Sequence, residues 1–176
     1  MSGLNKGLGK IEVALKWDPS PSGEPANDLD IVAGTYRATD PYGEPAYLVH
    51  FDSRSPDGTI YLNRDSRTGQ GLGTDEAMTL EFERLSEEYS RVVVGVAIQQ
   101  NAGRKTFADV RNTSVRIVEG YTELMEGDFS GVSGATAATV AEFTRDESGE
   151  WGMHGAIRGF TVDPETFTDV MGKDYS

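Results

Sequence analysis

The stretch Lys10-Ile-Glu-Val-Ala-Leu-Lys-Trp17 decides the fold class, because its apolar residues recur at every second position. Ile11, Val13, Leu15 and Trp17 share one side of an extended chain, and the residues between them are charged or small. A period of two predicts a strand with one buried face and one solvated face. The sequence therefore opens with a β-strand that must pack its apolar side against something else.

Further short segments have the composition of strands, and turn residues separate them. Residues 92–98 form a near-continuous apolar run, which predicts a central strand. Ser55-Pro-Asp-Gly58 is a strong turn signal, so we expect residues 47–51 and 59–62 to form a hairpin. The remaining expected strands are residues 29–36, 78–82, 114–118, 124–129, 138–143 and 151–160. No helix-length periodic segment lies between them, so the chain is predicted to be an all-β sandwich or barrel.

Helical signals are confined to two places. Residues 105–110 predict one short helical turn. A C-terminal helix is expected to begin with Asp163 as its cap and Pro164 in its first position, and to stop at Gly172. Phe167 and its apolar neighbours one helical turn later would dock this helix on the sheet. We see no linker or internal repeat and expect a single domain over residues 1–176.

Composition excludes several classes of function. The 176-residue chain has 16 basic and 29 acidic residues, for a net charge of −13, which disfavours nucleic acid and anionic membranes as partners. It has no cysteine, so disulfides, thiolate catalysis and thiolate-bound zinc are excluded. The first residues lack a signal peptide's apolar run, and no stretch approaches the ~20 apolar residues of a membrane span. We expect a cytoplasmic protein without an integral membrane segment.

Two acidic stretches point to a metal. Asp65-Ser-Arg-Thr-Gly-Gln-Gly-Leu-Gly-Thr-Asp75-Glu76 alternates three glycines between carboxylates, and glycine lets a loop turn its carbonyl groups inward. In Asp28-Leu-Asp30 two carboxylates at positions i and i+2 share one face of an extended chain. Carboxylate and carbonyl oxygens are the ligands that Ca²⁺ prefers, about 6–8 of them. We therefore expect these two stretches to meet and bind calcium.

The glycine-rich loop has other interpretations. The loop spans twelve residues like an EF-hand, but Arg67, Gly69 and Gln70 occupy positions where that motif needs other residues. A phosphate-binding loop would need a following helix, and a strand pattern follows instead. An ordinary flexible hairpin connection remains an open alternative. So does a surface role for Asp18 and Asp52, which are equally plausible as extra ligands.

Signals for catalysis are weak. The sequence has no nucleophile elbow, no Cys-His pair and no phosphate loop, and its two histidines, His50 and His154, lack metal-binding spacing. Trp17 and Trp151 lie at the ends of apolar strand patterns and are interpreted as core residues. Asp57 belongs to the Ser-Pro-Asp-Gly turn and is interpreted as a turn residue rather than a ligand. We therefore expect a protein that is not an enzyme.

These motifs together resemble the TerD family of tellurium-resistance and calcium-binding stress-response proteins, over about residues 10–160. The resemblance rests on the order and spacing of Leu15-Lys-Trp-Asp18, Asp28-Leu-Asp30, Ser55-Pro-Asp-Gly58, Asp65 to Gly71 with Asp75-Glu76, Arg116-Ile-Val118, Glu123-Leu124 and Gly149-Glu-Trp151 with Gly159-Phe160. It implies a two-sheet β-sandwich that binds calcium between the Asp-Leu-Asp segment and the acidic loop. It also implies a role in bacterial stress responses related to tellurite resistance, without a defined enzymatic activity.

The resemblance also implies the ligands. Asp28, Asp30, Asp65, Asp75 and Glu76 match the family's acidic positions, and we expect Thr68, Gly69 and Gly71 of the loop to complete the metal site. The family can hold two ions, but here Gln70, Leu72 and Thr74 stand where carboxylates are usual. Two carboxylates ~5 Å apart repel by ~3 kcal/mol at an effective dielectric constant of ~20, so five of them need a cation. We expect one Ca²⁺, with at most a weaker second.

The function expected from the sequence is thus a calcium-binding, non-catalytic stress-response module. It would act through calcium-dependent ordering of the loop and through other stress-response proteins as partners. A metal-independent scaffold or interaction domain is the first alternative, and calcium titration separates the two. A calcium-dependent hydrolase is the second, for which the sequence offers no convergent acid–base pair.

Overall fold

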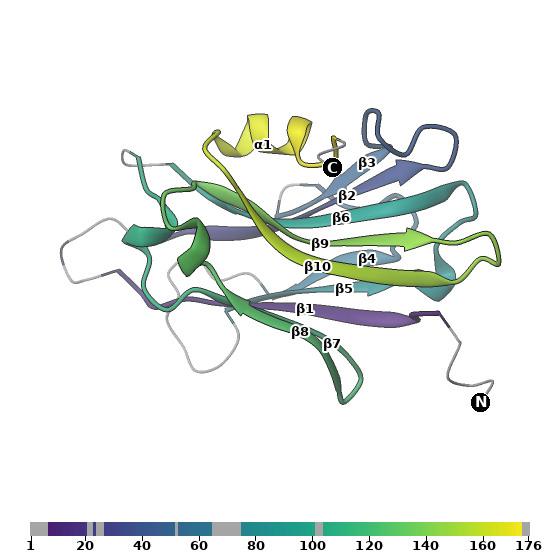
Figure 1. Ribbon diagram of the computed structural model, residues 1–176, viewed down its shortest axis with the longest axis horizontal. Coiled ribbons are helices and arrows are strands. Elements are labelled where there is room, and N and C mark those ends of the chain that lie inside the picture. The colour runs from purple at the N-terminus through teal and green to yellow at the C-terminus, as the bar shows by residue number, and fades with distance from the viewer. Residues whose placement is uncertain are drawn as a thin grey trace.

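Two five-stranded antiparallel sheets face each other in the computed structural model, which describes residues 7–20, 23, 27–51, 53–64, 75–100 and 104–173 (Figure 1). The first sheet has the order β4 (Ile60–Arg64), β5 (Glu76–Glu81), β1 (Lys10–Lys16), β7 (Ser114–Glu119) and β8 (Thr122–Asp128). The second has the order β10 (Trp151–Phe160), β9 (Ala137–Arg145), β6 (Tyr89–Ile98), β2 (Leu29–Arg37) and β3 (Tyr47–Val49). The predicted all-β, two-sheet sandwich is confirmed.

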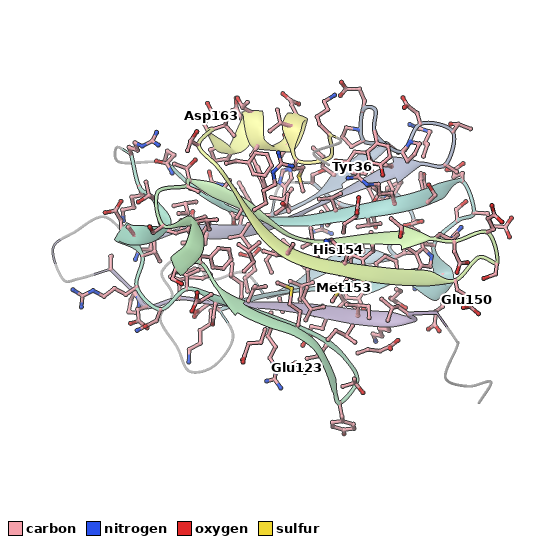
Figure 2. The ribbon with its side chains drawn as sticks, in the orientation of Figure 1. Tyr36, Glu123, Glu150, Met153, His154 and Asp163 are labelled. Carbon is pink, nitrogen blue, oxygen red and sulfur yellow. The ribbon has the colours of Figure 1, made fainter. Side chains whose placement is uncertain are left out.

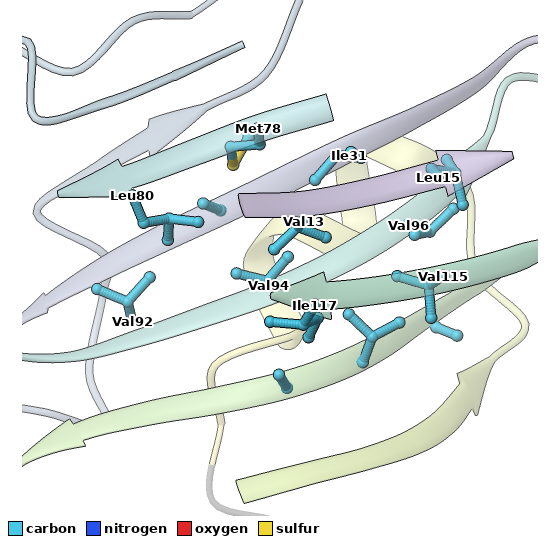
Figure 3. Packing of buried hydrophobic residues seen from close by; sticks show 14 of the residues in the cluster. Val13, Leu15, Ile31, Met78, Leu80, Val92, Val94, Val96, Val115 and Ile117 are labelled. Atoms are coloured by element: carbon cyan, nitrogen blue, oxygen red, sulfur yellow. The ribbon is translucent and has the colours of Figure 1, made fainter. Parts of the chain in front are cut away.

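The core lies between the sheets and follows the period of two in each strand. Val13 and Leu15 of β1 face Val94 and Val96 of β6 across the sandwich (Figure 3). All four side chains are fully buried, and Trp17 is only 1% exposed. The strand expected from the run at residues 92–98 is β6, the central strand of its sheet. Removal of this apolar surface from water is the main stabilising term of such a core.

The C-terminal helix α1 (Pro164–Val170) covers the outer face of the second sheet (Figure 1). The Asp163 carboxylate caps it by accepting a hydrogen bond from the Thr166 backbone N–H, as expected. Phe167 and Met171 are fully buried against Val93 of β6. Gly95 lies directly beneath the Phe167 ring, which leaves no space for a β-carbon. Three 3₁₀ turns complete the described elements: η2 (Phe82–Arg84), η3 (Phe107–Asp109) and η4 (Ser130–Val132).

The expected hairpin of residues 47–51 with 59–62 is wrong. The Ser-Pro-Asp-Gly turn does form, with the Asp57 carboxylate accepting hydrogen bonds from the Thr59 N–H (3.1 Å) and hydroxyl (2.7 Å). However, β3 pairs with β2 in one sheet, whereas β4 pairs with β5 in the other. A turn signal specifies a reversal of the chain but not the neighbour of the next strand. Here the turn carries the chain from the edge strand of one sheet to the edge strand of the other.

No helix in the described part of the chain is long and apolar enough to span a membrane.

Candidate metal site

Two acidic residues mark the start of β5. Asp75 precedes the strand, and its backbone N–H donates to the Leu15 carbonyl at 2.9 Å. Its carboxylate accepts a hydrogen bond of 2.8 Å from the Trp17 backbone N–H, and the residue is 2% exposed. Two bonds to the end of β1 therefore fix Asp75 at the point where the chain enters the sheet.

Glu76 ends the inward-facing row of β5. It lies opposite Leu15 of β1, and its side chain is fully buried between the sheets. Its Oε1 atom accepts a hydrogen bond of 3.1 Å from the backbone N–H of Ile31 in β2. A carboxylate from the first sheet thus contacts the backbone of the second.

The Ile31 N–H can donate this bond to Glu76 because β2 has an open edge there. The Gln99 N–H donates to the Asp28 carbonyl at 2.8 Å, so even-numbered residues of β2 pair with β6. Alternation then directs the Ile31 N–H toward the β3 side. However, β3 ends at Val49, opposite Ala33, and does not reach Ile31. Glu76 supplies the acceptor where the neighbouring strand has ended.

Asp28 and Asp30 are also buried, at 7% and 2% exposed. The Gln99 side-chain amide donates to Asp30 Oδ2 at 2.6 Å. Asp30 also lines a cavity of about 310 Å³ on the outer side of the second sheet, together with Pro164 of α1. Asp30 and Glu76 therefore approach the open edge of β2 from opposite faces of the strand.

These contacts place four of the eight expected ligands at one end of the sandwich. The other four lie outside the described residues: Asp65, Thr68, Gly69 and Gly71. Among the residues that the structure describes, no three acidic or histidine side chains converge as a complete metal-binding group. A calcium site here would therefore need oxygen ligands from residues 65–74 as well.

Several polar neighbours of this site were not expected from the sequence. Besides Gln99, the Lys105 ammonium group donates to the Asn27 side chain at 2.6 Å. The Asn112 amide donates to the Asp18 carboxylate at 2.7 Å, which ties the end of β1 to the chain before β7. Gln99 directly follows the apolar run of β6, and this abrupt polarity change was the available signal. The other contacts join distant residues and left no local pattern.

Comparison with known proteins gives the family. The model of the TerD domain matches residues 1–166. The chain belongs to the TerD family. This TerD-family chain is 31% identical over 163 residues to the uncharacterized protein YceE of Bacillus subtilis (strain 168), covering 89% of the chain and 84% of YceE. It is 27% identical over 155 residues to the tellurium resistance protein TerD of Serratia marcescens, covering 85% and 80%.

A stress-response relative and two solved structures are also similar. Stress response protein SCP2 of Bacillus subtilis (strain 168) is 26% identical over 161 residues, covering 82% of the chain and 80% of SCP2. The crystal structure of the protein SAV2460, of unknown function, has 62% identity and a TM-score of 0.95, covering 97% and 100%. A homologue of the telluride resistance protein TerD from Streptomyces coelicolor A3(2) has 57% identity and a TM-score of 0.93, covering 95% and 99%. The TerD family and its sandwich fold thus agree with the resemblance found in the sequence.

Proposed function

We propose that this TerD-family chain binds one Ca²⁺ at the open edge of β2 and acts as a non-enzymatic module of a bacterial stress response. The observation that carries the metal proposal is the hydrogen bond from the Ile31 N–H to Glu76. It brings the acidic start of β5 to the strand that holds Asp30, although the two segments are 45 residues apart. An ion at this edge would join the two sheets.

The chemistry of the buried residues supports a hard cation. Asp28, Asp30, Asp75 and Glu76 offer carboxylate oxygens and are all buried. Burial of charged carboxylates is costly unless positive charge offsets it, and Ca²⁺ supplies two positive charges together with a preference for oxygen ligands. Asp65 and the Thr68, Gly69 and Gly71 oxygens would complete the ligand set, with room for at most a weaker second ion.

The cellular role is proposed from relatives named for tellurium resistance and stress response. In this proposal the ion orders the acidic loop, and the ordered surface then engages other stress-response proteins. The chain has no cysteine, so it does not reduce tellurite through a thiol of its own. Binding, rather than catalysis, is the activity that we assign to it.

Calorimetric titration with Ca²⁺ after treatment with a chelator tests the metal proposal. We expect a dissociation constant of ~10⁻⁷–10⁻⁵ M, the range of sensor sites. At 100 times that constant the free energy of unfolding should rise by ~2.7 kcal/mol, and the melting temperature by roughly 5–10 °C. Absence of both heat and a melting shift at millimolar calcium would overturn the proposal and favour a metal-independent scaffold.

A further inference from the structure

In the part of the chain that the structure describes, the sandwich has four edge strands, which differ in how well they are protected against pairing with another chain. Natural edges are shielded by shortness, charge, proline or bulges. β3 has three residues, β4 has five, and β8 carries Glu123, Glu126 and Asp128. β10 is ten residues long and contains no proline. Its shielding by these devices is a register shift between Gly155 and Arg158 and the charge of Arg158, which leaves residues 152–156 without either.

β10 also carries no acidic residue. The chain has 29 acidic residues, yet none lies between Trp151 and Val162. Three glycines and Ala156 lie in β10, and most of its residues are exposed, including His154 and Gly155. Figure 2 shows His154 and Met153 on this strand, along the side of the molecule between the helix and the first sheet. The segment of residues 152–156 therefore carries no negative charge, and its bulky side chains are Met153 and His154.

The hydrogen-bonding direction of β10 follows from its turn with β9. The Asp146 N–H donates to the Glu150 carbonyl, so even-numbered residues at this end of β10 pair with β9. Alternation directs the backbone groups of Met153 and Gly155 outward. Neither residue has a backbone partner on that side among the residues that the structure describes. Farther along, a register shift between Gly155 and Arg158 interrupts the pairing, so the open segment is centred on residues 152–156.

The outward-facing carbonyl group of Trp151, at the start of β10, already accepts a hydrogen bond from another segment of the backbone. The Leu8 N–H donates to the Trp151 carbonyl at 2.9 Å, immediately before the open segment. This contact demonstrates that the edge accepts a peptide N–H from a passing chain. It also marks the end at which an added strand would have to stop.

The neighbouring edge strand determines the charge of the partner. A β-carbon added at Gly155 of β10 would lie 2.7 Å from the sulfur of Met125 in β8, and one added at Gly127 of β8 would lie 3.0 Å from Ile157 in β10. The β8 and β10 edges therefore lie against each other. β8 presents exposed Glu126 and Glu123 beside this edge, of which Glu123 pairs with Arg116, and β10 itself carries Arg158 beyond the open segment. A net charge of −13 disfavours a second copy of the chain and favours a positively charged partner.

We propose that the β10 edge adds an extended, basic segment of a partner protein as a further strand of the second sheet. Main-chain hydrogen bonds to Met153 and Gly155 would supply affinity, and lysine or arginine side chains facing β8 would supply selectivity. This inference rests on the proposed action through protein partners, and it assigns the surface and the chemistry of the partner. It places that surface on a different edge from the candidate metal site, which lies beside β3.

The test uses the full chain and three short probes in ¹⁵N NMR titrations, with and without Ca²⁺. The probes are acetyl-Lys-Val-Lys-Val-Lys-amide, its glutamate counterpart, and the lysine peptide N-methylated at each of its five residues, which removes the main-chain N–H groups from both of its edges. We expect only the unmethylated lysine peptide to shift the Met153 and Gly155 amide signals. The Val94 signal, in the central strand, should not move.

A matched pair of variants tests the role of charge. Ala156 is exposed on β10, so Ala156→Lys and Ala156→Glu add charges of opposite sign at the same position. We expect Ala156→Lys to lower the affinity for the lysine peptide by about two- to fivefold, the effect of one surface charge pair, and Ala156→Glu not to lower it. Equal effects of both variants, or equal binding of the methylated peptide, would overturn the proposal. Concentration-dependent shifts without any peptide would instead identify a second copy as the occupant.

The calcium site and the β10 edge can be refuted independently of each other. Loss of the peptide effect in a chain that still binds calcium refutes the β10 edge and leaves the metal site. A chain that binds the lysine peptide but no calcium refutes the metal site and leaves the edge.

Discussion

The guanidinium group of Arg91 donates a hydrogen bond of 2.7 Å to the carbonyl of Gly172, which lies 81 residues away just beyond α1. The same group bonds to the Pro41 carbonyl at 3.0 Å and to the Glu142 carboxylate at 2.5 Å. Arg91 is only 2% exposed, and its guanidinium carbon lies 4.4 Å from the centre of the Tyr42 ring. One buried side chain thus joins β6, β9, a loop and the C-terminal segment.

Replacement of Arg91 should be strongly destabilising. Arg91→Met leaves the Glu142 carboxylate and two carbonyl groups without this donor, and breaking a buried ion pair costs ~3–5 kcal/mol. Urea unfolding measures the loss. Arg116→Met is the control, because the Arg116–Glu123 pair is exposed and should contribute ~0–1 kcal/mol. Similar losses in both variants would show that the Arg91 contacts add no special stability.

Gly95 provides a second test of the helix contact. A β-carbon at Gly95 would lie 2.5 Å from the Phe167 ring and 2.9 Å from the Ala138 carbonyl oxygen. Gly95→Ala should therefore cost about 1–3 kcal/mol through overpacking. Adding Phe167→Leu should recover part of the loss, because the smaller side chain relieves the ring contact. A strictly additive double variant in urea unfolding would contradict this coupling.

Calcium affinity should distinguish ligands from turn residues. Asp30→Asn, Asp65→Asn and Glu76→Gln should each weaken Ca²⁺ binding at least about tenfold, because each would remove a charged oxygen ligand of the proposed site. Asp57→Asn should leave the affinity almost unchanged, since the Asp57 carboxylate is bonded within its own turn. Calorimetry on the four variants measures these effects. An Asp57 variant as damaged as the others would disprove the division.

The free energy of unfolding should depend on pH in the alkaline range because of Tyr89. Its hydrogen bond with Glu88, followed by burial, raises the pKa of Tyr89 from 10.0 to about 12. The neutral phenol is therefore favoured in the folded state, so its contribution is complete below pH 10 and is lost as the pH rises toward 12. The difference in unfolding free energy between the parent chain and Tyr89→Phe should shrink over this interval. A pH-independent difference would argue against the raised pKa.

The fold was predictable because the sandwich strands carry local signals. Residues 10–17 and 92–98 show their burial in their own patterns, and the structure has β1 and β6 there. The pairing of β3 was not predictable, because the turn after it looks the same whether the chain returns to one sheet or crosses to the other. The Gln99 contact with Asp30 joins residues 69 apart, and the Arg91 contact with Gly172 spans still more. Contacts of this range depend on the completed topology, so no local sequence pattern announces them.

β6 also limits how the length of this chain can vary. Its valines at 92, 94 and 96 fill the space between the sheets, whereas Val93 and Ala97 flank Gly95 beneath α1. Deletion of one residue in this strand would exchange the two sets, because side chains alternate between faces. A valine would then meet the Phe167 ring where only glycine fits. Insertions and deletions among related proteins should therefore accumulate in the connections between strands and be absent from β6.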